Sequence, residues 1–192
     1  MAVITNLDSA HAASPHPGSH RVSIASFTRA GNTTAYGAGD VLTDGNTAAI
    51  EFPKCGRSGK IIRASLGYED NNSTATDYEL YVFDEEPTNI ADNAAFALVS
   101  ADMPKLVAVF KFNDADAIIV TTTGVDILHY PMDSTTTHPA GHAFVTDDTP
   151  TISGDPATTQ YGGSLFGLLV TRTGYTPVAS TKIHIRLDIQ AD

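Results

Sequence analysis

The chain has 192 residues, 42% of them hydrophobic, and its 22 Asp and Glu outnumber its 11 Lys and Arg, which gives a net charge of −11. A chain of this length can bury a core of its own as a single domain. The acidic balance argues against a nucleic-acid partner, which needs clustered Lys and Arg. The apolar runs fall well short of the ~20 residues that span a membrane, so we expect no membrane partner.

Residues 1–21 are expected to form an extended N-terminal arm. They place histidine, proline and glycine among small residues, with the hydrophobic period of neither a helix nor a strand. The arm is either a loose terminus or a docking arm that becomes ordered on a partner. Its Val3, Ile4 and Leu7 are the candidates for such a contact, as an extra strand on a neighbour's sheet edge. The start lacks the basic residues and continuous apolar stretch of a secretory signal, so we expect a protein made in a cytoplasm and not secreted.

Residues 22–192 are expected to form one domain built from β-strands. Hydrophobic residues alternate with polar ones in short runs, and turn-forming Asp, Asn, Gly and Pro separate these runs. We predict about eight strands, at 22–28, 48–52, 59–68, 78–83, 105–112, 126–130, 164–172 and 182–190.

The alternation also predicts which side chains face the core, because successive residues of a strand point to opposite faces. In the last strand the expected core residues are Ile183, Ile185, Leu187 and Ile189, and the expected water-facing residues are Lys182, His184, Arg186 and Asp188. In 59–68, the residues expected on one face are Ile62, Ala64 and Leu66. The continuous apolar run at 164–172 predicts a strand that is buried on both faces.

Only one segment has a helical pattern: Asp92 is placed to cap a short helical turn over 93–99. Short strands without alternating helices favour an all-β fold, an antiparallel β-sandwich that resembles a jelly roll.

The motifs that carry chemistry are missing or incomplete. Cys55 lies near three basic residues that could favour a thiolate, but an unpaired cysteine at the end of a strand is usually incidental. Residues 56–60 place two residues between glycines where a phosphate-binding loop needs four. His138 and His142 are separated by Pro139 and Gly141, which rules out a shared helix face, and the acidic runs lack the pattern of a calcium loop. We therefore expect no enzyme, no cofactor and no metal site.

Charge is unevenly distributed along the chain. Residues 69–155 contain 16 acids and two bases, a charge of −14, whereas the remainder contains 6 acids and 9 bases, a charge of +3. Either the middle of the chain forms solvated acidic loops, or the molecule has an acidic outward end and a less repulsive docking end.

Residues 27–42 contain an unusual combination of short words, Phe-Thr-Arg at the start, Asn-Thr-Thr-Ala-Tyr in the middle and Gly-Asp-Val-Leu at the end. Three further segments follow in order, at 58–62, at 80–96 and at 165–175. Together they resemble small virion structural proteins of tailed bacteriophages, over residues 22–190.

The resemblance implies a capsid decoration (cement) protein on the outer surface of the virion, with no catalytic residue. Its implied partners are the major capsid protein, contacted through the candidate residues Val3, Ile4 and Leu7, and copies of itself in a homotrimer. The segment 27–42 is either a well-formed loop or a contact with a neighbouring subunit, and Arg29, Thr34 and Tyr36 are the candidates for that contact.

Two other functions stay open at this point. One is a tail, baseplate or head-fibre module that binds a receptor or joins components. The other is a carbohydrate-binding or hydrolytic β-sandwich, because paired carboxylates can meet in space from distant positions. Against the latter, the chain has no Trp to stack on sugar rings.

Overall fold

The computed structural model describes residues 20–45, 49–56, 58–69, 76–122, 125–130, 142–145 and 163–191. The expected N-terminal arm, with Val3, Ile4 and Leu7, lies outside the described residues except at its end. There, His20 and Arg21 already belong to the first strand, two residues before the expected start of the domain.

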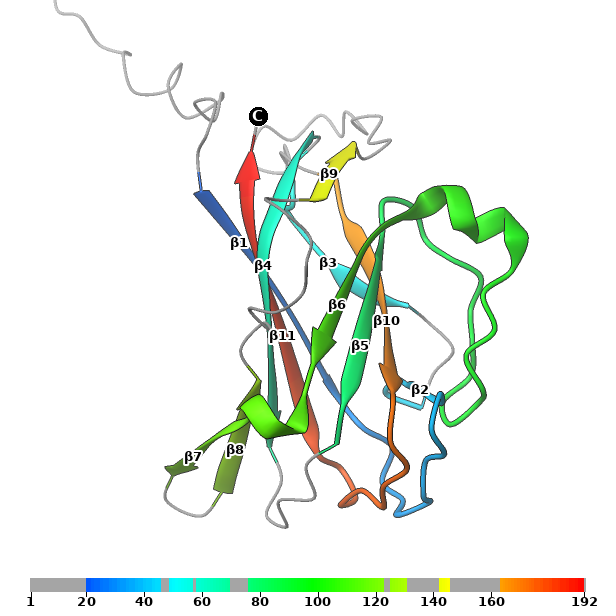
Figure 1. Ribbon diagram of the computed structural model, residues 1–192, viewed down its shortest axis with the longest axis vertical. Coiled ribbons are helices and arrows are strands. Elements are labelled where there is room, and N and C mark those ends of the chain that lie inside the picture. Colours follow the sequence, from blue (N-terminus) through cyan, green and yellow to red (C-terminus); the bar gives the residue numbers. More distant parts are fainter. Residues whose placement is uncertain are drawn as a thin grey trace, which may run out of the picture.

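The described residues form eleven strands in two antiparallel sheets, which confirms the expected all-β sandwich (Figure 1). The strands are β1 (His20–Thr28), β2 (Val41–Leu42), β3 (Ile50–Phe52), β4 (Ser58–Glu69), β5 (Tyr78–Phe83), β6 (Leu106–Phe112), β7 (Ile118–Thr122), β8 (Val125–Tyr130), β9 (His142–Val145), β10 (Leu165–Thr171) and β11 (Lys182–Ala191).

The first sheet has the order β1-β11-β4-β8-β7, and β9 also pairs with β4. The second has the order β2-β10-β5-β6, and β3 also pairs with β10. The eight predicted strands did not include β2, β7 and β9; β2 and β9 have only two and four residues, too few for an alternating pattern. Within the described residues, no helix is long and apolar enough to cross a membrane.

The central strand β11 confirms the expected core. Its four alternating aliphatic residues, from Ile183 to Ile189, are all fully buried between the sheets. One prediction for this strand is wrong: Asp188 is only 7% exposed instead of facing water. The reason is Arg186 on the same face, whose guanidinium donates two hydrogen bonds to Asp188 Oδ1, from Nε at 2.9 Å and from Nη2 at 2.7 Å.

Strand β4 contains a β-bulge that corrects the expected core face. Ala64 and Leu66 are fully buried and Ile61 is 1% exposed, whereas Ile62, expected on the same face as Ala64 and Leu66, is 41% exposed. On β11, Asp188 pairs with Arg63 but the next residue pairs with Ile61, so Ile62 is an extra residue in the ladder. One extra residue reverses the faces on one side of a bulge, which moves Ile62 to the outer surface.

Strand β10 is buried on both faces, as its continuous apolar run predicted. Leu165 and Leu169 pack in the main core between the sheets, and Leu168 and Val170 pack in a second apolar cluster on the other face. The long connection between β5 and β6 contributes partly buried residues to that second cluster, including Phe96. Figure 1 shows this connection beside β10, on the side away from the first sheet.

The helical turn expected over 93–99 is wrong. Asn93 has a positive φ of 59°, and Ala95 pairs with Asp40 in an isolated β-bridge. Backbone pairing with the segment around β2 therefore outweighs the helix propensity of the alanines. Helical structure in the described residues is limited to two 3-10 turns, η1 (Ser100–Lys105) and η2 (Asp114–Asp116).

Candidate interaction surfaces

Arg29 and Tyr36 form a buried polar pair at the end of β1. Each is 2% exposed, and Arg29 Nε donates a hydrogen bond of 2.8 Å to the Tyr36 hydroxyl. The guanidinium carbon also lies 4.9 Å from the centre of the Tyr36 ring, and Nη1 donates to the carbonyl of Val178 at 3.1 Å. These contacts satisfy a buried charge that would otherwise be costly.

The Tyr36 hydroxyl donates a hydrogen bond of 2.7 Å to Asp92 Oδ1. Burial raises the pKa of Tyr36 well above its usual value, against the opposing hydrogen bond from Arg29, so the hydroxyl remains a donor. The same Asp92 oxygen accepts the backbone N–H of Thr43 at 2.9 Å. Asp92, expected to cap a helix, instead ties the end of β2 to Tyr36.

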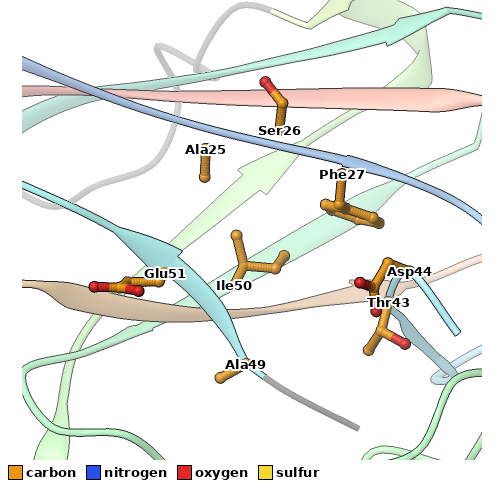
Figure 2. Close-up of a pocket in the computed structure, with 8 residues that line it drawn as sticks. All are labelled: Ala25, Ser26, Phe27, Thr43, Asp44, Ala49, Ile50 and Glu51. Atoms are coloured by element: carbon orange, nitrogen blue, oxygen red, sulfur yellow. The ribbon is translucent and has the colours of Figure 1, made fainter. Parts of the chain in front are cut away.

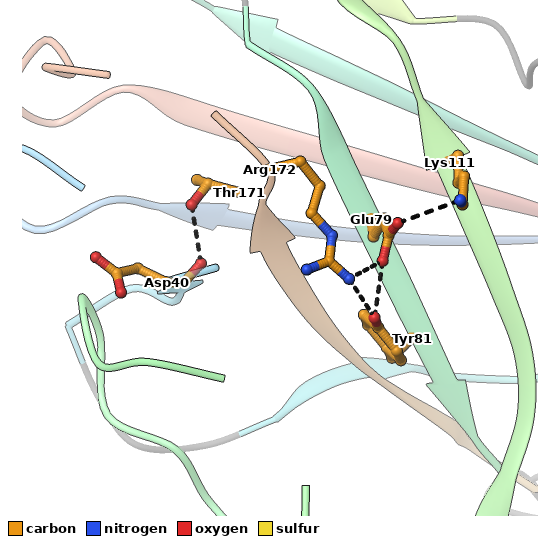
Figure 3. Close-up of polar contacts among 6 residues, drawn as sticks. All are labelled: Asp40, Glu79, Tyr81, Lys111, Thr171 and Arg172. Carbon is orange, nitrogen blue, oxygen red and sulfur yellow. Dashed lines mark hydrogen bonds and ion pairs between the residues drawn. The ribbon is translucent and has the colours of Figure 1, made fainter. Parts of the chain in front are cut away.

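Strand β10 and the residues after it also contact Tyr36 and its loop. The Tyr36 ring stacks on Tyr175, with 5.5 Å between ring centres, and the two residues also pair as a β-bridge. Thr171 donates its hydroxyl to the carbonyl of Gly37 at 2.8 Å and contacts the carbonyl of Asp40 at 3.2 Å (Figure 3). Three segments of the phage-protein resemblance, 27–42, 92–96 and 165–175, thus meet in one joint.

The joint bears on the residues expected to contact a neighbouring subunit. Arg29 and Tyr36 are satisfied within their own chain and present almost no surface, so they stabilise the fold and offer little to a second subunit. Thr34 is exposed, with its N–H on Asn32 Oδ1 at 3.1 Å, and for Thr34 the subunit contact stays a prediction. The sequence singled out this segment, but it could not show that Tyr36 hydrogen-bonds to Asp92.

Cys55 is fully buried, and the basic residues near it do not make it a thiolate. Burial raises the pKa of the Cys55 thiol, and its Sγ lies 3.1 Å from the carbonyl oxygen of Phe52, to which it donates. Within the part of the chain that the structure describes, no three His, Cys, Asp or Glu side chains gather as metal ligands would. His138 lies outside the described residues, and the acidic run 114–116 is exposed.

A cavity of about 160 Å³ opens between β1 and β3, at the edge of the sandwich (Figure 2). Ala25 and Phe27 point from β1 towards Ile50 on β3 and form an apolar floor, whereas Ser26 points away. Glu51 lies at one end, where its Oε1 accepts the Ser164 hydroxyl at 2.6 Å. A cavity of this size holds one side chain or a molecule about as large as benzene.

A charged cluster ties together the outer surface of the second sheet (Figure 3). Glu79, 8% exposed, accepts hydrogen bonds from the Arg172 guanidinium and from the Tyr81 hydroxyl at 2.7 Å, and Lys111 Nζ lies 3.6 Å away. Burial raises the pKa of Glu79, but the bonds from Arg172 and Tyr81 and the nearby positive charges outweigh it, so the pKa is lowered. Burial, together with Glu79, raises the pKa of Tyr81 to about 12.

The outer surface of β1, β11 and β4, which we name the basic face, has a different charge from the rest of the molecule. Its charged residues are the bases Lys60, Arg63, Lys182 and Arg186 and the acids Glu69 and Asp188, four bases against two acids in a chain of net charge −11. Val22 and Ile24 on β1 are 41% and 56% exposed, and Ile62 on β4 is 41% exposed. This surface combines positive charge with exposed aliphatic side chains, as a docking surface would.

The basic face is also well ordered by contacts between strands. His184 on β11 pairs its Nδ1 with the Ser26 hydroxyl of β1 at 2.8 Å and its Nε2 with Glu69 Oε1 of β4 at 2.9 Å. A surface held across three strands in this way can meet a partner without losing much side-chain freedom.

No protein-family model matches the chain, and a search of curated proteins finds no match. Among solved structures, that of Cocksfoot mottle virus is similar over 90% of this chain and 92% of that chain, with 14% identity and a TM-score of 0.25. A TM-score this low carries no argument about shared fold or function.

Proposed function

We propose that the chain is an accessory protein of a bacteriophage virion, a decoration (cement) protein that binds the outer capsid shell across major capsid protein subunits. The observation that supports it is the joint of Arg29, Tyr36, Asp92 and Tyr175. Segments that resemble phage virion proteins at three separate places in the sequence contact one another directly in space. Short sequence motifs that occur together in a group of proteins are expected to contact one another when they build one structural unit.

The joint also gives the residues of these motifs a structural role that requires no catalytic activity. Its charged and aromatic residues bind one another and hold the loops at one end of the sandwich in place. A protein of this kind stabilises a shell by binding the assembled form and not the free subunits, which favours assembly by mass action.

Binding to shells tests the proposal. Purified protein should bind assembled capsid shells, empty or filled, in a fixed ratio to the major capsid protein, and should not bind the free subunit. A negative control is a denatured sample of the same protein that has not recovered its far-UV circular dichroism spectrum; this sample should not bind shells. Few copies per particle would contradict a decoration role and favour the tail, baseplate or head-fibre module.

The N-terminal arm is the proposed shell contact, through Val3, Ile4 and Leu7. Because β1 begins at His20, deletion of residues 1–19 removes no part of the described sandwich. The truncated chain should unfold cooperatively but lose shell binding. Retention of full shell affinity by the truncated chain would place the contact on the sandwich instead.

A further inference from the structure

The first sheet has β1 at one edge and β7 at the other (Figure 1), and hydrophobic residues are exposed at both edges. At the β1 edge, Val22 and Ile24 are 41% and 56% exposed and belong to the basic face. At the β7 edge, Ile118 is 55% exposed and follows the exposed acids Asp114 and Asp116 of η2. The patch at the β1 edge thus adjoins four bases and two acids, a net positive surface, whereas the patch at the β7 edge combines one aliphatic side chain with acids.

The register of the sheet places both patches on the same outer surface. Residues directly opposite each other on paired strands point to the same face. From the β7 edge to the β1 edge, one row of such partners is Ile118, His129, Gly67, His184 and Ser26. Ser26 shares its face with Ile24, two residues earlier on β1, so Ile118 and Ile24 lie on one surface, separated by the width of the sheet.

The acidic patch has a defined shape. Asp77, at the start of β5, accepts the backbone N–H of Asp114 on its Oδ1 at 2.8 Å, which holds η2 in place beside the start of β7. The hydrogen bond places Asp77 beside η2, whose Asp114 and Asp116 precede Ile118 closely in the chain. Beside the β1 edge, Lys182 is exposed on the adjacent strand β11, and Arg63 is exposed on β4, the strand beyond β11.

We propose that the patch at the β1 edge binds the patch at the β7 edge of a second copy of this chain. Two copies with a charge of −11 each repel one another unless bases of one face acids of the other. Pairing the two patches achieves this, and it also buries Val22 and Ile24 against Ile118. The inference rests on the self-association in the proposed function, and it names the contact. A homotrimer would use each patch once per copy, because a ring of three is built from head-to-tail contacts.

Substitution of the aliphatic residues tests the contact in the full-length chain. Ile24→Ser and Ile118→Ser should each weaken self-association, measured by sedimentation velocity or light scattering, by about tenfold or more, as central apolar contacts do. Met103→Ser is the matched control, because Met103 on η1 is 56% exposed, the same fraction as Ile24, and lies in neither patch. It should leave self-association unchanged.

Charge reversal gives a second and sharper test. One variant combines Lys182→Glu with Arg63→Glu, and the other combines Asp114→Lys with Asp116→Lys. Each alone should be monomeric at concentrations where the wild type associates. Their equimolar mixture should associate again, in complexes in which the two variants alternate, because each variant can bind only the other. Lys54→Glu, at an exposed base outside both patches, is the control for a change of net charge.

Several results would overturn the inference. A monomeric wild-type chain would do so, and so would reversed variants that fail to associate when mixed. If deletion of residues 1–19 abolished self-association while the Ile24 and Ile118 variants still associated, the N-terminal arm and not the two patches would form the contact between copies.

Shell binding, measured separately, distinguishes this inference from the proposed function. If the chain self-associates through these patches but does not bind shells, the proposed function fails and the contact stands. If the wild type is monomeric and binds shells, the contact fails and the proposed function stands.

Discussion

One hydroxyl group, that of Tyr36, lies between a buried arginine and a carboxylate from a distant part of the chain. It accepts from Arg29 Nε and donates to Asp92 Oδ1, so it satisfies two groups with one atom. Because Arg29 and Tyr36 are each only 2% exposed, the loss of either hydrogen bond leaves a buried polar group without that partner.

Tyr36→Phe should therefore destabilise the fold. The ring and its stacking on Tyr175 remain, while Arg29 Nε and Asp92 lose their common partner, which costs about 1–3 kcal/mol. The measurement is the free energy of unfolding in denaturant. Thr34→Ala is the matched control: it removes an exposed hydroxyl from the same loop and should change that free energy by less than about 0.5 kcal/mol. Equal stability of Tyr36→Phe and wild type would contradict the role of the joint.

Glu79 should make stability depend on pH in the acidic range. Its pKa is lower in the folded chain than the ordinary value of 4.5, so its contribution is present above that value and is lost as the pH falls through the folded pKa. Glu79→Gln should therefore destabilise the protein at neutral pH, and its difference from wild type should shrink on acidification. Unfolding free energies of both chains across that range provide the check. A difference that stays constant with pH would assign the effect to packing alone.

The sequence alone indicated only part of these hydrogen-bond networks. The segment with Arg29 and Tyr36 stood out in the sequence, but the partner Asp92 lies far along the chain and was expected to cap a helix. Side-chain alternation does not show which distant carboxylate meets a tyrosine. The same limit applies to Asp188, whose burial depends on Arg186 on its own strand.

Among the elements, strands with several alternating residues were predictable and strands shaped by their neighbours were not. The range of β5 was predicted residue for residue, and those of β6 and β11 to within one residue. The bulge at Ile62 was not predictable, because an extra residue in β4 exists only relative to its pairing with β11. The alanine-rich segment after Asp92 favours a helix locally, and its pairing with the β2 region prevents one.

The packing of β10 against the main core can be tested at its glycine. A Cβ added at Gly167 would lie 2.8 Å from Cε2 of Phe52 and 3.1 Å from Cδ1 of Leu80, both in the core. Gly167→Ala should destabilise the fold by about 1–3 kcal/mol, the usual range for overpacking. Gly67→Ala on β4 is the matched control, since its Cβ would lie 3.7 Å from Cβ of His184, an ordinary contact. Thermal unfolding of both variants compares them, and equal melting temperatures would contradict tight packing around β10.

In the molecule as a whole, the residues that stabilise the fold differ from the residues that are exposed for docking. Charged and aromatic residues that stand out in the sequence, such as Arg29 and Tyr36, are inside. The surfaces available for docking, in contrast, consist of ordinary residues such as Val22, Ile24 and Ile118, which no motif marks. Their placement at two edges of one sheet depends on the order of the strands, and that order cannot be read from alternation alone.

The rupture of phage particles that lack this protein tests the proposed decoration role most directly. Particles with and without the protein are heated, or diluted from high osmolarity, and release of DNA is followed by a fluorescent dye. Particles without the protein should rupture at lower temperature and under weaker shock, and addition of the purified chain should restore the wild-type thresholds. Thresholds that are the same with and without the protein would contradict a stabilising role on the shell.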